Sequence, residues 1–424
     1  MTSLSLSAYR LATHAAAPFA GALLSLRLNK GKEDPERLDE RRGLAATPRP
    51  DGPLVWLHGA SVGETVSLLP LVERLTQSGL RALVTSGTMT SARLMAQRLP
   101  PRAQHQFAPL DAPVFCRRFF RHWRPDLGLI AESELWPNMI VEAARAGVPL
   151  AMVNARMSER SFRRWSRMPG LARGMLSRID LALTQSAGDA ERLTQLGAPA
   201  AQETGNMKFD APPPPADLRE LAELAGLTAG RRLWIAASTH PGEERVAAEA
   251  HLRLSAEFPD LLTLIAPRHP ERGAEIAREL RELGLACALR SQGRRPERDC
   301  GIYICDTIGE LGLFYRLAGV VFLGKSLVGA GGQNPIEPAK LASAILHGPH
   351  VGNFADVYAP LDAAGGAIVA QDADGLAAAL AGLFHDPAGQ RDMARIAAEL
   401  VERRGGAVER TLAALSKHFA AVLA

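Results

Sequence analysis

One stretch decides the fold: Gly324-Lys-Ser-Leu-Val-Gly-Ala-Gly-Gly-Gln-Asn-Pro-Ile-Glu-Pro-Ala-Lys340. The short apolar run at 319–323 precedes it, and a run of this kind is typical of a buried strand. Gly329, Gly331 and Gly332 then leave backbone N–H groups uncovered and permit positive φ angles. This order of residues predicts a buried strand that is followed by a glycine loop.

The residues after the glycine loop predict the start of a helix. Asn334 suits the N-cap, Pro335 the first helical position, and Glu337 the place that a capping box requires. Unpaired N–H groups and the positive end of the helix dipole would converge there, so the stretch predicts an anion site for a phosphate or nucleotide. The alternative is that Asn334 and Glu337 only cap a helix.

Strands and helices alternate along the rest of the chain. The apolar runs that predict strands are Leu54–Leu57, Leu83–Val84, Asp126–Ala131, Val148–Val153, Ile179–Thr184, Leu233–Ala237, Leu261–Ile265, Gly301–Cys305, Val320–Leu323 and Ala344–Leu346. Helical patterns, such as those at 65–75 and 91–99, lie between them. This alternation predicts an α/β protein with parallel, doubly wound sheets.

The run Asp210-Ala-Pro-Pro-Pro-Pro215 divides the alternation into two halves. Four consecutive prolines cannot continue a helix or a central strand. We therefore predict two Rossmann-like domains, residues 43–210 and 217–424, joined by a proline linker at 211–216. The last helix is a candidate to pack back on the first domain. Ligands of such folds bind at the carboxyl ends of the strands, so we expect them in the cleft between the two domains.

Residues 1–42 form a separate segment in this prediction. The run from Leu11 to Leu26 contains no Lys, Arg, Asp or Glu, but Pro18 interrupts it, and its reach of about 24 Å is slightly short of a bilayer core. Arginines and lysines follow the run, whereas a signal peptide has its charge before the apolar region. We expect a membrane-associating helix, spanning the bilayer or lying at its interface, with the basic flank on the cytoplasmic side. An amphipathic helix packed on the domain is the alternative.

The composition, with 47% hydrophobic and 22% charged residues, is that of a globular protein. The net charge is +4, and no arginine tract is interleaved with aromatic residues, so the sequence gives nucleic-acid binding little support. A mildly basic surface suits an anionic membrane or a phosphorylated substrate. The four cysteines form no CxxC pair, so we expect neither a zinc site nor a disulfide framework, and a reducing cytoplasm fits.

The string His58-Gly-Ala-Ser-Val-Gly-Glu64 directly follows the first predicted strand. Its glycines let the turn pass close to a ligand, and Glu64 is expected at the cleft near a helix start. A carboxylate there can act as the general base for an attacking hydroxyl group. The alternative is a Glu that the helix dipole favours.

Three more charged residues are expected near the same cleft. Glu132 and Glu134 follow a strand and, in an extended segment, would point to opposite sides, one to the site and the other to a structural bond. Alternatively both cap the helix that Pro137 helps to start. Lys208 lies just before the proline linker and can offset charge on a leaving phosphate, although a hinge salt bridge is the competing interpretation.

In the second domain, the strings at 237–243 and 266–270 each follow a predicted strand. Ser238 and Thr239 supply hydroxyl groups and Arg268 supplies a cation. Together with residues 306–311 and the opening stretch, they predict one nucleotide-sized site.

Two patterns resemble metal ligands but have simpler interpretations. His240 and His269 lie in turns. Asp372-Ala-Asp374 matches the short acidic string of many metal-dependent sugar transferases, but it opens an Ala/Leu helix, so N-capping explains it better. We predict no metal site.

Taken together, eight strings resemble the bacterial transferases that add 3-deoxy-D-manno-octulosonic acid (Kdo) to lipid A precursor. They occur in the family's order, from His58 onward: HGASVGE, AESELWPN, VNARMS, GNMKFD, ASTHPGEE, APRHP, DTIGEL and GGQNPIEPA. Any one string is weak, but the ordered set is highly specific. The resemblance implies two Rossmann-like domains of GT-B type and an inverting reaction that needs no metal or cofactor. It also implies CMP-Kdo as donor, the lipid A precursor lipid IVA as acceptor, and the cytoplasmic side of the inner membrane as location.

The resemblance also implies roles for individual residues. Glu64 would be the general base, and Glu134 and Lys208 would steady charge in the transition state. The residues that would hold CMP are Pro267, Arg268, Ile308, Gly309, Glu310, Asn334, Pro335, Ile336 and Glu337.

One departure from the family pattern concerns Gln333, where the commoner string has His. Gln donates a hydrogen bond but carries no charge, so no proton-transfer role is assigned to it. Two alternative functions stay open. One is another GT-B glycosyltransferase that uses a UDP- or ADP-sugar, and the other is a non-catalytic, membrane-associated nucleotide-binding module.

Overall fold

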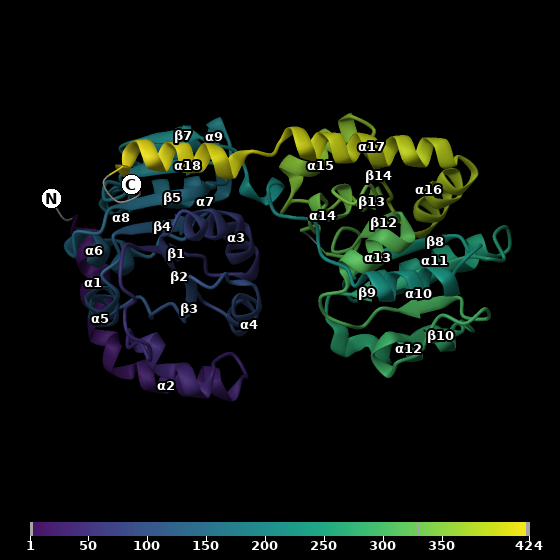
Figure 1. Cartoon of the computed structure of the whole chain (residues 1–424), viewed down its shortest axis with the longest axis horizontal. Coiled ribbons are helices and arrows are strands. Elements are labelled where there is room, and N and C mark those ends of the chain that lie inside the picture. The colour runs from purple at the N-terminus through teal and green to yellow at the C-terminus, as the bar shows by residue number, and fades with distance from the viewer. Residues whose placement is uncertain (1–2, 330, 421–424) are drawn as a thin grey trace. The chain divides into compact units, whose positions relative to one another are not determined.

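The computed structural model describes residues 3–329 and 331–420. The chain forms two compact units: unit 1 comprises Met1–Ala211 and Arg404–Ala424, and unit 2 comprises Pro212–Arg403. Each unit has its own seven-stranded sheet, in which neighbouring strands run parallel (Figure 1). The prediction of an α/β protein with parallel, doubly wound sheets is confirmed.

The sheet of unit 1 has the strand order β3-β2-β1-β4-β5-β6-β7. Its strands are β1 (Leu54–His58), β2 (Arg81–Ser86), β3 (Ala103–Phe107), β4 (Leu127–Ala131), β5 (Leu150–Ala155), β6 (Leu181–Thr184) and β7 (Ala201–Glu203). The order reverses between β1 and β4, so this pair marks the topological switch point. The sequence did not predict β3 and β7, because these edge strands are only partly buried and lack an apolar run.

Helices cover both faces of this sheet (Figure 1). One face packs against α3 (Val62–Gln77), α4 (Met89–Arg98) and α18 (Ala407–His418). The other face packs against α5 (Pro113–Trp123), α6 (Pro137–Arg145), α8 (Pro169–Leu176) and α9 (Ala187–Leu196). The remaining elements of unit 1 are α1 (Leu4–Ala16), η1 (Ala17–Phe19), α2 (Ala20–Asn29), η2 (Pro35–Arg42), α7 (Glu159–Ser166) and η3 (Met207–Phe209).

The apolar N-terminal run is not one helix. It is divided between α1 and α2 by the short turn η1, which contains Pro18. α1 packs on unit 1: Leu6 is fully buried and Arg10 forms an ion pair with Glu142. Among residues 3–329 and 331–420, no helix has the length and apolar character needed to cross a membrane.

Part of the expected basic flank is also engaged within unit 1. Arg41 is buried and forms an ion pair with Glu33, which also binds Arg27. Buried, paired arginines of this kind are not available to a membrane surface. Lys30 and Lys32 remain exposed.

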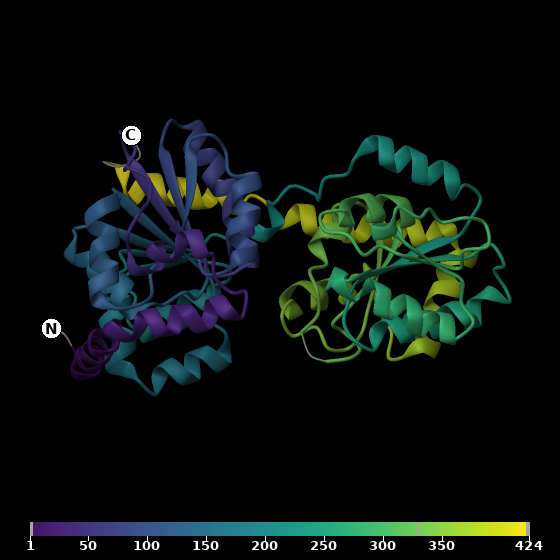
Figure 2. The same ribbon diagram turned by 90° about the horizontal axis from the view of Figure 1, so that it is seen from below.

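The sheet of unit 2 has the strand order β10-β11-β9-β8-β12-β13-β14. Its strands are β8 (Leu233–Thr239), β9 (Leu262–Pro267), β10 (Cys287–Leu289), β11 (Ile302–Ile304), β12 (Val320–Leu323), β13 (Ala344–His347) and β14 (Ala367–Val369). Here the order reverses between β8 and β12. The other elements are α10 (Leu218–Leu227), α11 (Glu243–Ser255), η4 (Pro270–Arg272), α12 (Gly273–Glu282), η5 (Arg290–Gln292), α13 (Leu311–Ala318), α14 (Ile336–Ala339), α15 (Ala355–Ala363), α16 (Ala373–His385) and α17 (Pro387–Arg403). Figure 2 shows both sheets from below.

The proline run lies against α13 in unit 2. Arg316 donates a hydrogen bond to the carbonyl oxygen of Pro214 at 2.8 Å. A side chain at position 312 would collide with the carbonyl oxygens of Pro214 and Pro215, so this close approach requires Gly312.

The last helix, α18, belongs to unit 1. Its Val408 and Leu415 are buried in the same core cluster as α3. The carboxylate of Asp210 accepts hydrogen bonds from the N–H groups of Gly406 and Val408, both at 2.5 Å. The Asp210 side chain therefore connects the end of the first segment of unit 1 to the start of the C-terminal segment that returns to unit 1.

Candidate active site

Unit 1 brings Glu64 and Glu134 to the same edge of its sheet. Glu64 lies in the first turn of α3, directly after β1, and Glu134 follows the end of β4. The two strands are neighbours at the switch point, where open α/β sheets bind ligands beyond the carboxyl ends of their strands.

Glu64 is the third residue of α3 and forms a capping box with Ser61. Its carboxylate accepts hydrogen bonds from the Ser61 hydroxyl at 2.6 Å and from the N–H groups of Ala60 at 2.7 Å and Ser61 at 3.3 Å. Glu64 therefore has the structural role at the helix start that was the alternative to the general base. A carboxylate has about four acceptor positions, so these three bonds leave room for a substrate hydroxyl group.

Glu134 has a strongly perturbed carboxyl group. Burial, the nearby charge of Glu64 and that of Glu132 raise its pKa from 4.5 to about 7, against the hydrogen bond that Trp136 donates at 2.7 Å. Glu64 and Glu134 follow neighbouring strands at the same edge, so the charge of one disfavours ionisation of the other. A carboxyl group that changes protonation near neutral pH is suited to proton transfer.

Glu132 does not lie in an extended segment as predicted. It has a φ of 50°, so the chain turns directly after β4, and its carboxylate forms an ion pair with Lys208 at 2.6 Å. The competing interpretation of Lys208, a salt bridge, is therefore what the structure contains. Asn154, near the end of β5, accepts a hydrogen bond from the N–H of Met207 at 2.9 Å and so fixes the segment that carries Lys208.

The alternative interpretation of Glu132 and Glu134 as helix caps is not confirmed. Neither Glu132 nor Glu134 caps α6, whose N-cap is Trp136 without a side-chain bond. His58 is buried beneath the edge, where its Nδ1 lies 2.9 Å from the Thr85 hydroxyl. Burial lowers the pKa of His58 to about 4, so this imidazole is neutral at neutral pH.

In unit 2, the glycine loop after β12 already holds an anion, the carboxylate of Glu243. This fully buried carboxylate accepts hydrogen bonds from the N–H groups of Lys325 at 2.6 Å, Ser326 at 2.9 Å and Leu327 at 3.0 Å. It also accepts one from the N–H of His240 at 2.9 Å. The N–H groups of two of the predicted glycines are also engaged, because Gly331 donates to the carbonyl oxygen of His350 at 3.1 Å and Gly332 to that of Lys325 at 2.7 Å. The prediction of uncovered N–H groups is therefore wrong for these two glycines.

The predicted helix start after the loop is also shifted. α14 covers only Ile336–Ala339, and its N-cap is Pro335, which was predicted as the first helical residue. Asn334 lies one residue earlier, where its side chain accepts a hydrogen bond from the N–H of Ile336 at 3.1 Å. A four-residue helix has little dipole, so it contributes little to an anion site.

Side chains instead supply the positive charge at this edge. The pKa of His240 is lowered by its burial, and the charges of Lys325, His269 and Arg268 lower it further against the opposing effect of Glu243. His240 directly follows β8, Arg268 directly follows β9 and Lys325 lies two residues beyond β12. The rings of His240 and His269 are 6.0 Å apart. The lowered pKa leaves His240 neutral at neutral pH, so Arg268 and Lys325 supply the positive charge of this cluster. This cluster can bind a phosphate, since Arg and Lys both pair with phosphate oxygens.

The other predicted donor residues lie on loops of unit 2. Ile308 is 88% exposed and Gly309 has a φ of 87°. Glu310 forms an ion pair with Arg290 at 2.5 Å, and this bond lowers the pKa of the Glu310 carboxyl. Gln333 lies 3.4 Å from His240, between their Nε2 atoms.

Two residues at the carboxyl edge of the unit 2 sheet, Glu243 and Lys325, were not predicted from the sequence to organise this edge. Glu243 had a signal, because a carboxylate in the first turn after a strand is favoured by the helix dipole. Its burial under the loop depends on a contact across 82 residues, which no local pattern reveals. Within the described part of the chain, no group of three His, Cys, Asp or Glu side chains is placed to hold a metal ion, and Asp372 caps α16.

The chain is similar to known proteins in sequence and in fold. A family model described as 3-Deoxy-D-manno-octulosonic-acid transferase (kdotransferase) matches residues 36–211. A 3-deoxy-D-manno-octulosonic acid transferase of Bordetella pertussis is 38% identical over 88% of this chain and 89% of its own length. A probable mitochondrial 3-deoxy-D-manno-octulosonic acid transferase of Arabidopsis thaliana is 36% identical over 82% of this chain and 80% of its own length.

Among solved structures, an S. aureus MnaA–UDP complex covers 87% of this chain and 97% of its own length, with a TM-score of 0.60 and 16% identity. At that identity the likeness concerns the fold alone. It confirms the prediction of two Rossmann-like domains of GT-B type.

Proposed function

The chain belongs to the 3-deoxy-D-manno-octulosonic acid (Kdo) transferase family, and on that premise we propose that it transfers Kdo from CMP-Kdo to the lipid A precursor lipid IVA in lipopolysaccharide biosynthesis. The single observation that carries the catalytic part is the pair Glu64 and Glu134 at the switch point of unit 1. The reaction proposed for this pair is inverting and uses no metal or cofactor.

Glu64 is the general base of the proposed reaction. The acceptor hydroxyl oxygen bonds to the anomeric carbon of Kdo while the bond from that carbon to the CMP phosphate oxygen breaks. The hydroxyl proton passes to the Glu64 carboxylate, and CMP leaves with the electron pair of the broken bond. A single in-line attack inverts the configuration and requires no covalent intermediate.

Glu134 and Lys208 support this step. At neutral pH the Glu134 carboxyl is partly protonated, because burial and Glu64 raise its pKa. A protonated carboxyl donates a hydrogen bond to charge that develops in the transition state. Lys208, held beside Glu132, adds a cation at the same edge.

Unit 2 holds the donor in this proposal. The cluster of His240, Arg268 and Lys325 faces the phosphate of CMP. The loops around the donor contain Pro267, Ile308, Gly309 and Glu310. The ribose binds to the stretch formed by Asn334, Pro335, Ile336 and Glu337, because the Glu337 carboxylate accepts hydrogen bonds from hydroxyl groups.

The N-terminal helices suit association with the cytoplasmic face of the inner membrane. Five large apolar side chains between Leu4 and Leu26 are exposed: Leu4, Leu11, Phe19, Leu23 and Leu26. Helices that expose apolar side chains bind at membrane interfaces without spanning the bilayer. We propose this peripheral attachment because the acceptor is a membrane lipid.

The donor specificity is tested by following nucleotide release from CMP-Kdo, a UDP-sugar and an ADP-sugar in the presence of lipid IVA. We expect release of CMP that depends on the lipid, and no release from the other two donors. Turnover of a UDP- or ADP-sugar in place of CMP-Kdo would favour another GT-B glycosyltransferase. Binding of CMP-Kdo without any turnover would favour the non-catalytic module.

A further inference from the structure

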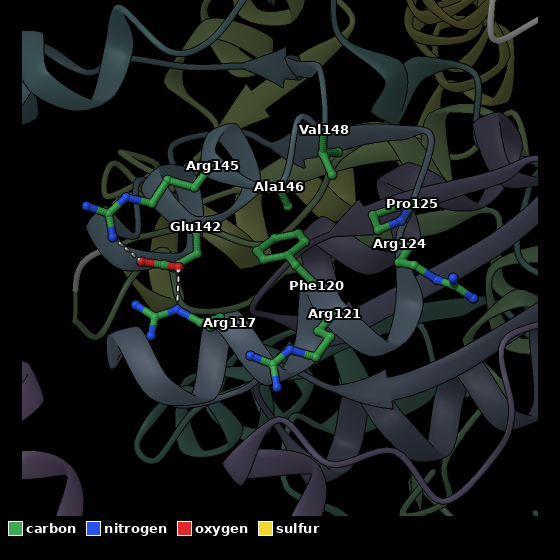
Figure 3. Close-up of a pocket in the computed structure, with 9 residues that line it drawn as sticks. All are labelled: Arg117, Phe120, Arg121, Arg124, Pro125, Glu142, Arg145, Ala146 and Val148. Atoms are coloured by element: carbon green, nitrogen blue, oxygen red, sulfur yellow. Dashed lines mark hydrogen bonds and ion pairs between the residues drawn. The ribbon is translucent and has the colours of Figure 1, made fainter.

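A cavity of about 520 Å³ lies on unit 1, away from the sheet edge that carries Glu64 and Glu134 (Figure 3). It is formed by the ends of α5 and α6 and by the loops that lead into β4 and β5. Its lining residues are Arg117, Phe120, Arg121, Arg124, Pro125, Glu142, Arg145, Ala146 and Val148. Pro125 and Val148 precede β4 and β5, so the cavity is at the amino ends of the strands, whereas Glu64 and Glu134 lie at the carboxyl ends.

The lining carries more positive charge than the protein neutralises. Arg117 and Arg121 lie one turn apart on α5, Arg124 follows as the C-cap residue of that helix, and α6 adds Arg145. Among the lining residues named above, only Glu142 carries a carboxylate. Like charges at this spacing destabilise a helix, so the arrangement carries an energetic cost.

Glu142 is already shared among three arginines. It pairs with Arg10 at 2.5 Å, Arg145 at 3.0 Å and Arg117 at 3.3 Å, and Figure 3 shows it between the last two. Burial alone would raise the pKa of Glu142, but the hydrogen bonds and charges of Arg10 and Arg117 lower it, so it is ionised at neutral pH. Glu142 thus fixes two guanidinium groups of the lining without neutralising the others.

Arg121 and Arg124 are exposed, and over residues 3–329 and 331–420 no hydrogen bond or ion pair engages either guanidinium. Arg124 ends α5 with a φ of 40°, a left-handed conformation that favours glycine. An arginine at such a position gives up backbone stability for its side chain. The ring of Phe120 lies in the middle of the group, packed against Trp56 and Phe119, and its 2% exposed edge forms an apolar part of the lining (Figure 3).

We propose that this cavity binds a phosphate ester, with Arg121 and Arg124 contacting the phosphate and Phe120 contacting the carbon skeleton next to it. Guanidinium groups bind phosphate oxygens through paired hydrogen bonds, and the cavity has the size of a small-molecule site. The same chemistry is offered by a phospholipid headgroup and by a soluble phosphate ester. α1, which packs on α5 and α6, brings exposed apolar residues to this side of the unit, as a lipid source would require.

The test uses the full chain and two probes with the same phosphate ester. Vesicles of phosphatidylcholine, with and without phosphatidic acid, are assayed by co-sedimentation, and glycerol 3-phosphate is titrated by calorimetry. The double variant Arg121→Gln/Arg124→Gln is compared with Arg93→Gln/Arg98→Gln, which removes the same charge from exposed positions of α4. We expect the first variant to lose about tenfold or more in affinity for at least one probe, and the control to match the wild type.

The pattern of losses identifies the source of the ligand. A loss confined to vesicles with phosphatidic acid assigns a lipid headgroup, and a loss that includes glycerol 3-phosphate assigns a soluble ester. Unchanged binding of both probes by the double variant, or an equal loss in the α4 control, overturns the proposal.

The helix dipole is another reason for arginines at the end of α5, and a second variant separates it from binding. Arg124→Gly relieves the left-handed backbone, so we expect a melting temperature that is unchanged or higher together with weaker binding of the same probe. A lower melting temperature with wild-type affinity would mean that Arg124 serves only the helix, and would overturn its assignment to the phosphate.

Discussion

At the scale of single residues, Glu64 has a structural duty that can be separated from its proposed chemistry. Its carboxylate closes the capping box of α3, and glutamine is the other residue that fills this position. Glu64→Gln therefore keeps the cap but removes the base. We expect kcat to fall by about 10²–10⁴-fold with the melting temperature and CMP-Kdo affinity little changed.

Ser61→Ala is the matched control for this prediction. It removes the hydroxyl that caps α3 and leaves the Glu64 carboxylate in place, so it should cost about 1 kcal/mol of stability with a smaller loss of activity. If Glu64→Gln loses stability and retains its turnover, Glu64 is only a capping residue.

The titration of Glu134 gives a second prediction at this scale. The pKa of its carboxyl rises from the ordinary glutamate value of 4.5 to about 7 in the folded protein, so folding favours the protonated form. The stability that this group contributes is present below pH 4.5 and is lost as pH rises through 7. Glu134→Gln should therefore unfold less readily than the wild type above pH 7, by about 1–2 kcal/mol, in urea titrations across this range.

The same titration tests the coupling of the two carboxyls. Because the charge of Glu64 is the second cause of the shift after burial, Glu64→Gln should lower the pKa of Glu134 only in part, as measured by carboxyl-carbon NMR. An unchanged pKa of Glu134 in that variant would show that the two groups do not interact.

At the scale of elements, the carboxyl edge of the unit 2 sheet depends on a loop that a buried carboxylate holds in place. Glu243, in the first turn of α11, accepts hydrogen bonds from the N–H groups of Lys325, Ser326 and Leu327. Without it, those buried donors lose their partner. Glu243→Ala should therefore lower the free energy of unfolding by about 3 kcal/mol or more and abolish CMP-Kdo binding.

The control for this variant is Glu249→Ala on the same helix. Its carboxylate forms an exposed ion pair with Arg245, so its loss should cost less than about 1 kcal/mol. Chemical denaturation and calorimetric titration of CMP-Kdo measure both quantities. A Glu243→Ala variant with wild-type stability would show that the loop does not depend on this carboxylate.

Local patterns predicted the elements of the sheets better than the contacts at their edges. The apolar runs that become β1, β4, β8 and β12 are buried on both faces, and such runs are visible in sequence. The contact between Glu243 and the glycine loop is not visible in sequence, because this contact joins segments that are far apart in the chain. The boundary of α14 depends on where one turn of helix begins, which tertiary contacts decide.

At the scale of the whole molecule, the chain enters unit 2 once and returns to unit 1 once. Asp210 accepts hydrogen bonds from Gly406 and Val408, and Val408 and Leu415 are buried in the core of unit 1. Unit 1 is thus built from two segments of the sequence, and unit 2 from one continuous segment.

This division predicts how fragments behave. A fragment of residues 212–403 should fold alone, whereas residues 1–211 should be unstable, because each buried Val or Leu of α18 contributes about 1.5–3 kcal/mol. Adding a peptide of residues 404–424 should restore cooperative unfolding of residues 1–211, as followed by circular dichroism. Full stability of residues 1–211 without the peptide would show that α18 is dispensable for this unit.

The most direct test of the proposed reaction is the mass of the lipid product. Wild-type protein incubated with CMP-Kdo and purified lipid IVA should add the mass of one or more Kdo residues to the lipid, and Glu64→Gln should bind CMP-Kdo but form the product about 10²–10⁴-fold more slowly. A lipid of unchanged mass with the wild-type protein, or equal rates from the two proteins, would contradict the proposal.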